Sequence, residues 1–201
     1  MTSSEVEALF ARRDLPLAGL AGQADAVARA CHAIATRFHQ GGKLIAFGNG
    51  GAATDAAHVA VEFVHPVIVG KRALPALSLT ADVATLTGLA NREGFPEVFA
   101  LPLRRLAVPA DIALGISSDG DCRNVLRGLQ TAREQGLLTV GLVGGDGGTI
   151  AASGIVDHLL IVRSEDPRVV KEAHVTTYHI LWELVHVFFE QPGALTPELV
   201  G

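Results

Sequence analysis

The chain has 201 residues, 49% of them hydrophobic and only 18% charged, which suits one well-buried domain rather than two. A formal net charge of −5 without any run of lysine or arginine argues against nucleic-acid or anionic-membrane binding and favours a small-molecule ligand. Because Cys31 and Cys122 fit no disulfide framework or metal-binding spacing, and neither a secretory signal nor a membrane span is recognisable, we expect a cytoplasmic protein.

Two helices are expected ahead of the sheet. Apolar residues recur at three- and four-residue spacing over residues 5–12 and again over 20–39, which predicts a short helix followed by a long one. The large apolar fraction leaves hydrophobic surface to be covered, and contacts between identical subunits would cover it. We therefore expect the helices of residues 1–40 to pack at an oligomer interface.

Short apolar runs bounded by turn residues predict strands buried on both faces, at residues 43–47, 75–79, 111–117, 137–143 and 157–162. Helical patterns lie between and after them, at residues 52–65, 96–107, 121–135 and 167–190. The alternation predicts a single α/β domain over 1–201, with its core in 41–190: a doubly wound, five-stranded parallel sheet flanked by helices. Ligands bind such folds at the carboxyl edge of the sheet.

Two turns at this edge suggest an anion site. The first, Gly48-Asn49-Gly50-Gly51, precedes a helix whose first N–H groups favour an anion. The second begins with Ser117 and Ser118, whose hydroxyls add donors. Together they predict a phosphosugar cradle. No nucleotide cofactor is expected, because the dinucleotide pattern Gly-x-Gly-x-x-Gly fails at Ala53. The later turn at 144–150 is assigned no chemistry.

Two helices each offer a carboxylate and an imidazole. His58 and Glu62 share one face of the 52–65 helix, and Glu172 and His179 share a stripe of the 167–190 helix. Such groups could hold a divalent metal or supply a general acid and base. The histidines assigned only structural roles are His32, His39, His65, His158 and His186.

The segments "GNGGAATDAAHVAVE", "NREGFPEVFA", "GDCRNVL" and "KEAHVTTYHILWELV" resemble, in order and spacing, the phosphoheptose isomerases of the sugar isomerase (SIS) domain superfamily. The resemblance covers roughly residues 30 to 190. It implies a homotetramer with active sites between subunits and conversion of sedoheptulose 7-phosphate to a heptose 7-phosphate. It further implies Glu62 as base and His179 as acid, with zinc or a similar divalent ion held by His58, Glu62 and His179. A fourth metal ligand would be Glu172, a solvent molecule or the substrate.

The first set of departures from the family lies at the phosphate turns. Ala52 stands where the family has a serine hydroxyl, and Asp119 and Cys122 replace two more hydroxyls. Asp121 adds a further carboxylate. We expect Asp119 and Asp121 to repel a phosphate dianion, and Asp119→Ser together with Ala52→Ser to restore its binding. A rival arrangement, in which Asp119 turns away to cap the following helix, would leave the cradle intact.

The second set lies at the sugar end. Asn91-Arg92 replaces the family's Asn-Asp, Arg168 replaces an Asp, and Lys171 replaces a Gln. The pattern suggests a sugar derivative other than the ordinary heptose phosphate, bound in the opposite sense or carrying an amine or neutral group, or a site without catalysis. Two functions follow: an aldose–ketose isomerase of a sugar phosphate or related sugar derivative, or a non-catalytic regulatory protein similar to the replication initiator-associating protein of this family.

Overall fold

The computed structural model describes residues 2–191 and 193–195 and contains one five-stranded sheet. The strand order is β2-β1-β3-β4-β5, and every neighbouring pair is parallel. The strands are β1 (Leu44–Gly48), β2 (Ala76–Ser78), β3 (Ile112–Ser117), β4 (Leu138–Gly144) and β5 (His158–Val162). All five predicted strands are confirmed to within one residue at each end, because mainly apolar runs fit a sheet covered on both faces.

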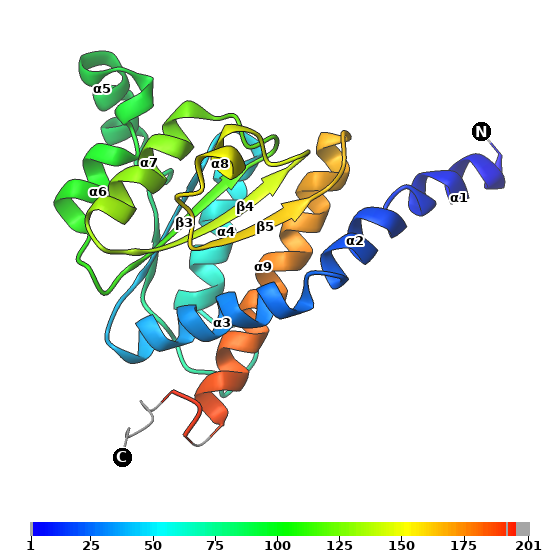
Figure 1. The fold of residues 1–201 in the computed structure, drawn as a ribbon, viewed down its shortest axis with the longest axis horizontal. Coiled ribbons are helices and arrows are strands. Elements are labelled where there is room, and N and C mark those ends of the chain that lie inside the picture. The colour runs from blue at the N-terminus through cyan, green and yellow to red at the C-terminus, as the bar shows by residue number, and fades with distance from the viewer. Residues whose placement is uncertain (1, 192, 196–201) are drawn as a thin grey trace.

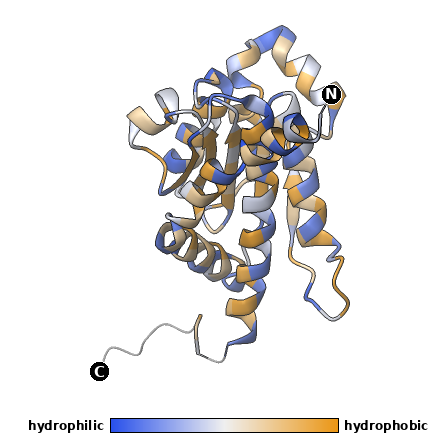
Figure 2. Cartoon of the chain, turned by 90° about the vertical axis from the view of Figure 1, so that its right-hand side faces the viewer, coloured by the Kyte–Doolittle hydropathy of each residue, from blue (hydrophilic) through white to orange (hydrophobic). Residues whose placement is uncertain are grey.

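Helices cover both faces of this sheet (Figure 1). One face packs against α3 (Ala24–His39), α4 (Gly51–Val64) and α9 (Pro167–Glu190). The other packs mainly against α6 (Ala100–Leu106), α7 (Arg123–Glu134) and α8 (Gly148–Ser153). Each face has its own hydrophobic cluster, and Figure 2 shows hydrophobic residues along the strands inside the domain. The doubly wound α/β fold is therefore confirmed.

Several helix boundaries differ from the prediction. The expected helix over 20–39 is interrupted at Gly22 and Gln23, so that α2 (Asp14–Ala21) precedes a separate α3. The 96–107 pattern divides into a short 3-10 turn, η1 (Phe95–Glu97), and α6. Helix α5 (Val83–Glu93) was not predicted. None of its residues is fully buried, and only Leu86, Leu89 and Ala90 pack against the core. Helix α8 forms where only a connection was expected.

The N-terminal helices extend away from the sheet, and Figure 1 shows α1 (Ser3–Ala11) at the far end of this extension. No residue of α1 is buried, and the side chains of Phe10 and Leu15 are 71% and 84% exposed. Exposed apolar side chains of this kind are usual at subunit contacts, which agrees with the predicted oligomer interface. The interface itself stays a prediction. No helix among the described residues is long and apolar enough to span a membrane.

Candidate functional site

The point where the sheet order reverses lies between β1 and β3. The helix after β1, α4, covers one face of the sheet, whereas the helix after β3, α7, covers the other. Divergent connections of this kind open a crevice at the carboxyl edge. Here Asn49 and Asn124 exchange two amide hydrogen bonds, of 2.7 and 2.8 Å, which join the turn after β1 to the first turn of α7. Asn49, expected to bind substrate, therefore also fixes the frame of the site.

A pocket of about 200 Å³ lies beside this crevice, lined by the first turn of α4, the turn after β3 and the first turns of α9. Gly50 has a φ of +55°, a left-handed conformation that suits glycine and leads directly into α4. The predicted substrate-binding residues that line the pocket are Asn49, Gly51, Ala52, Ser118 and Lys171. Several of the candidates therefore lie at one cavity, and their role in substrate binding stays a prediction.

Lys171 is bound inside this pocket to three groups of α4. Its Nζ donates to Asp55 Oδ1 at 2.6 Å, to the Gly51 carbonyl at 2.9 Å and to Thr54 Oγ1 at 3.2 Å. The Asp55 side chain is only 5% exposed, whereas that of Lys171 is 44% exposed. Lys171 therefore neutralises a buried carboxylate and ties the start of α4 to α9.

His174 lines the same pocket and was not assigned by the sequence analysis. Its ring is buried, and burial lowers its pKa to about 4. A hydrogen bond with the Val143 backbone acts in the opposite direction but is the smaller effect. The ring is therefore neutral at pH 7, and its Nε2 atom has no hydrogen-bond partner. The only sequence indication was its place between the apolar residues Val170 and Ala173 and the buried Thr177 on the inner face of α9.

The carboxylates of the second turn do not line this pocket. Asp119 Oδ1 accepts hydrogen bonds from Ser117 Oγ at 3.0 Å and from the Asp121 backbone N–H at 2.9 Å. Asp121 Oδ1 accepts from the Thr149 N–H at 2.8 Å, at the start of α8. Cys122 Sγ lies 3.8 Å from Asp119 Oδ1. Local N–H and O–H groups therefore hold both carboxylates within their own turns, and their repulsion of phosphate stays a prediction.

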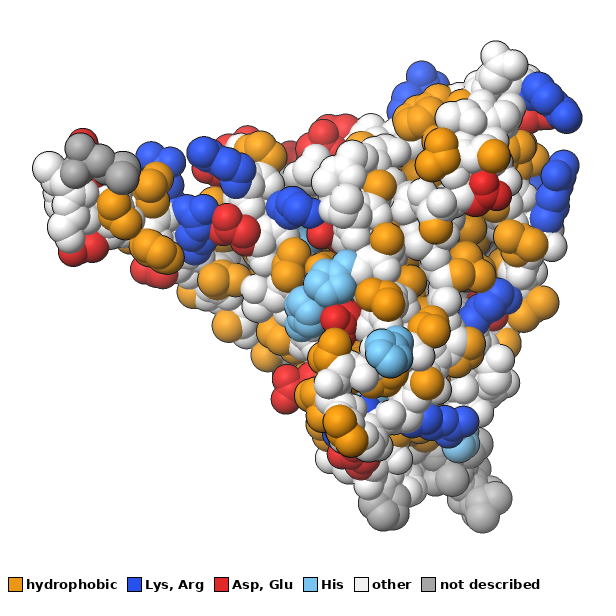
Figure 3. All heavy atoms as spheres, turned by 180° about the vertical axis from the view of Figure 1, so that it is seen from behind, with side chains coloured by type: hydrophobic (Ala, Val, Ile, Leu, Met, Phe, Trp, Pro, Cys, Tyr) orange, Lys and Arg blue, Asp and Glu red, His pale blue; other side chains and the backbone are white. Residues whose placement is uncertain are grey.

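Farther along α4 and α9, His58, Glu62 and His179 converge. One ligand atom from each lies within 4.8 Å of the other two. His58 Nε2 is 3.1 Å from Glu62 Oε1, and the two imidazole rings have centroids 5.2 Å apart. Glu62 is buried, His179 is half-buried and His58 is exposed. Figure 3 shows histidine side chains beside an acidic one on the surface of this face.

Each member of this cluster is held by a second contact. Tyr178 Oη is 2.8 Å from His58 Nδ1, and His179 Nδ1 is 2.8 Å from the Val175 carbonyl. The indole N–H of Trp182 donates to the Glu62 backbone carbonyl at 2.8 Å. These partners leave His58 Nε2, His179 Nε2 and the Glu62 carboxylate for one another and for a ligand. Tyr178 and Trp182 were not among the residues predicted from the sequence.

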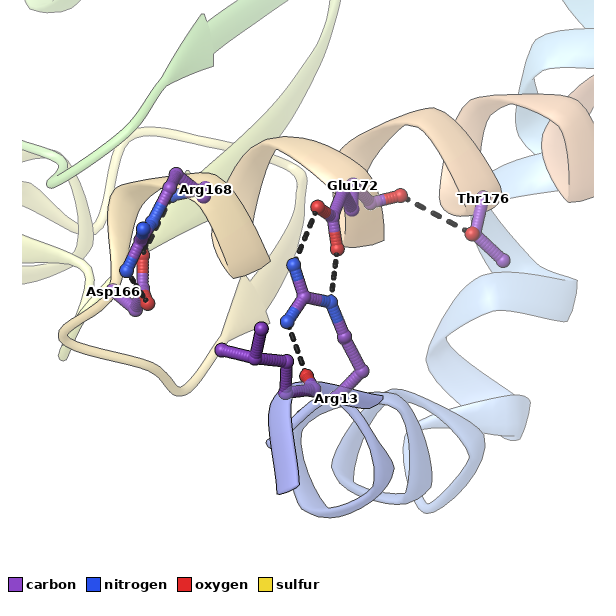
Figure 4. A network of polar contacts seen from close by, with 6 residues as sticks. Arg13, Asp166, Arg168, Glu172 and Thr176 are labelled. Atoms are coloured by element: carbon purple, nitrogen blue, oxygen red, sulfur yellow. Dashed lines mark hydrogen bonds and ion pairs between the residues drawn. The ribbon is translucent and has the colours of Figure 1, made fainter. Parts of the chain in front are cut away.

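Other candidates are not brought to this cluster in the described chain. Glu172 instead forms two hydrogen bonds with Arg13, at 2.7 and 2.8 Å (Figure 4), which removes it as a fourth metal ligand. Arg168 pairs with Asp166 at 2.8 Å, and its hydrogen bonds lower the pKa of that carboxyl to about 2. Asn91 and Arg92 lie exposed on α5, with Arg92 beside Glu93. Their assignment to substrate remains a prediction.

The chain matches the family model for the SIS domain over residues 13–144. It is 41% identical to the phosphoheptose isomerase of Solidesulfovibrio magneticus over 88% of this chain and 85% of the relative. It is 45% identical to the phosphoheptose isomerase of Pelobacter propionicus, over 74% of this chain and 77% of the relative.

Solved structures of phosphoheptose isomerases also share the fold of this chain. The phosphoheptose isomerase GmhA from Neisseria gonorrhoeae superposes with a TM-score of 0.83 at 30% identity, over 90% of this chain and 97% of that one. A phosphoheptose isomerase from Francisella tularensis superposes with a TM-score of 0.82 at 29% identity, over 92% of this chain and 98% of that one. The NanR protein of Vibrio vulnificus, at 15% identity and a TM-score of 0.67, over 96% of this chain and 67% of that one, shares the fold alone.

Proposed function

Because this chain belongs to the phosphoheptose isomerase family of SIS domain proteins, we propose that it interconverts an aldose and a ketose of a sugar phosphate by proton transfer between C1 and C2. The convergence of His58, Glu62 and His179 carries the proposal. A site that had lost its chemistry would have no need to keep a carboxylate and two imidazoles in contact. The relatives do not favour the non-catalytic alternative.

The cluster and the pocket suit the two ends of such a substrate. Lys171 in the pocket and His179 in the cluster lie about two turns apart on α9, a separation of roughly 12 Å along its axis. Asp55 and Glu62 have a similar separation on α4. We place the reacting carbons at the cluster and the remote end of the sugar phosphate in the pocket. Neutral His174 lines this pocket and contributes an uncharged polar side chain to it.

In the reaction, the Glu62 carboxylate removes the proton from the carbon next to the carbonyl and returns it to the neighbouring carbon. Protonated His179 donates from Nε2 to the carbonyl oxygen, because its Nδ1 is bound to the Val175 carbonyl. This gives an enediol. To form the product, His179 takes the proton of the other enediol hydroxyl, whose oxygen becomes the new carbonyl oxygen, while Glu62 delivers its proton to the former carbonyl carbon. Burial of Glu62 and its contact with His58 hold the carboxylate in one position for both transfers.

The same three residues fit a divalent metal, since two histidines and one glutamate are a usual donor set of catalytic zinc. We therefore propose zinc or a similar ion at this site. When bound, it would take the Nε2 lone pair of His179 and polarise the substrate carbonyl as a Lewis acid in place of that proton donor. Elemental analysis of protein purified without chelator or metal affinity should give one equivalent of metal per chain, and a metal-free protein would leave the three residues as acid–base groups only.

We also propose that the chain forms a homotetramer through its N-terminal helices and acts in the cytoplasm. The exposed apolar side chains of α1 and α2, Phe10 and Leu15 among them, support the assembly. Cys31 and Cys122 are both free in the structure, which agrees with a reducing compartment. Internal proton transfer requires no nucleotide cofactor.

The activity is tested on a panel of C5 to C8 aldose and ketose phosphates, with product analysis by chromatography. We expect at least one pair to interconvert, and Glu62→Gln and His179→Asn each to lower kcat by about 100-fold or more, the usual contribution of a general base or acid. The matched control is His65→Asn, an exposed histidine at the end of α4 outside the cluster. Absence of interconversion across the panel contradicts the proposal.

A further inference from the structure

Tyr178 is the one tyrosine of the chain, and its side chain is completely buried beside the cluster. Its hydroxyl lies 2.8 Å from Nδ1 of His58, and the two rings are nearly perpendicular, with centroids 5.4 Å apart. The hydroxyl thus contacts the ring nitrogen of His58 that faces away from Glu62.

The contact on the other side of the ring restricts the tautomer of His58. A neutral imidazole has one N–H donor and one lone pair, and a carboxylate only accepts. Without a cation, the 3.1 Å contact between Nε2 and Glu62 therefore requires the proton on Nε2. In the neutral ring, Nδ1 is then an acceptor, and the Tyr178 hydroxyl donates to it.

A divalent cation reverses these roles. If Nε2 binds a metal through its lone pair, the proton of the neutral ring must lie on Nδ1. The Tyr178 oxygen then accepts the hydrogen bond that it previously donated. A hydroxyl can serve both arrangements because it is at once a donor and an acceptor.

His179 provides an internal comparison. Its Nδ1 faces the Val175 carbonyl, which only accepts, so Nδ1 is fixed as a donor. Its Nε2 is thus ready for a metal at all times in the neutral ring. His58 is the one histidine of the cluster whose backing group permits both tautomers.

We propose that Tyr178 is the positioning residue of His58 and supports it in two states, one hydrogen-bonded to Glu62 and one bound to a divalent metal. This deepens the proposed function, since it rests on metal binding at the same cluster. Tyr178 itself touches neither the substrate nor the metal. When His58 changes from its hydrogen bond with Glu62 to a bond with a metal, the Tyr178 hydroxyl and Nδ1 of His58 stay hydrogen-bonded to each other, so neither buried polar atom is left unpaired.

The test compares wild-type protein with Tyr178→Phe, which keeps the ring, and with the matched control Thr177→Val. Thr177 is the preceding residue, and its buried hydroxyl donates to the Ala173 carbonyl, away from the cluster. Co²⁺ titration of chelator-stripped proteins, followed by visible absorption, should show about tenfold weaker binding in Tyr178→Phe, at the lower end of outer-shell effects. Thr177→Val should bind within twofold of the wild type by the same reasoning.

The second readout is ¹⁵N NMR of the metal-free histidine rings, with the His58 signals assigned through a His58→Gln variant. In Tyr178→Phe, the His58 Nδ1 resonance should move towards that of an acceptor without a partner, while the His179 signals stay in place. A His58 resonance that does not move, or cobalt binding within twofold of the wild type, overturns the proposal, as does a wild type that binds no cobalt. Neither readout needs turnover, so absence of isomerase activity contradicts only the proposed reaction.

Discussion

Replacing Lys171 with methionine should destabilise the fold through the carboxylate that it leaves behind. The Lys171 ammonium binds Asp55 at 2.6 Å, and the Asp55 side chain is only 5% exposed. Removing one partner of a buried pair costs about 3–5 kcal/mol. Because the lysine end is 44% exposed and water reaches it, the expected loss in the free energy of unfolding is smaller, about 2 kcal/mol.

A double-mutant cycle separates this effect from lost packing. In an Asp55→Asn background no buried charge remains, so Lys171→Met should cost only about 1 kcal/mol or less. Urea unfolding of the four proteins at one protein concentration, followed by circular dichroism, gives the free energies. The control is Lys71→Met, because Lys71 pairs with a carboxylate of Glu190 that is 59% exposed. An equal loss from Lys171→Met in both backgrounds refutes the role given to the ion pair.

Three further predictions concern single features. The free energy of unfolding should fall by up to about 3 kcal/mol from pH 6.5 to pH 4. In this range His174 binds a proton in the unfolded chain but not in the folded one, where burial lowers its pKa to about 4. Urea unfolding of His174→Phe should show a smaller pH dependence than the wild type, and an unchanged pH profile contradicts the prediction. The double variant Phe10→Asp, Leu15→Asp should form a smaller assembly by light scattering, whereas an unchanged mass removes these side chains from the interface. Asp119→Ser should change sugar phosphate affinity by less than about threefold in calorimetry, because the carboxylate is held by its own turn and its exposed charge is screened by salt. A tenfold gain in affinity would support the repulsion hypothesis instead.

The fold was predictable where burial is uniform or caps are clear. The strands read as continuous apolar runs, and α9 has the predicted bounds because the Asp166 side chain caps it and Pro167 opens it. The α5 helix was not predicted from apolar periodicity, since none of its residues is fully buried, although the Asp82 cap marks its start. The interruption at Gly22 was also missed, because the apolar spacing continues across it.

The site was predictable only to the extent that it depends on spacing within a helix. His58 and Glu62 four residues apart must share a face, and this pair is the best-founded part of the site. The charges around it follow from partners distant in the sequence. Glu172 is taken by Arg13 and Lys171 by Asp55, and neither pairing leaves a local pattern. Residue identity could therefore not tell which charges face the ligand.

Proton exchange with solvent tests the central claim most directly. With a sugar phosphate substrate in D₂O, the wild-type protein should place deuterium at C2 of the aldose, detected by mass spectrometry and proton NMR. Glu62→Gln should lower the exchange rate by about 100-fold or more, because Glu62 is the group that carries the proton between carbons. If no deuterium enters any substrate of the C5 to C8 panel, or if Glu62→Gln exchanges as fast as the wild type, the isomerase mechanism assigned to this cluster is wrong.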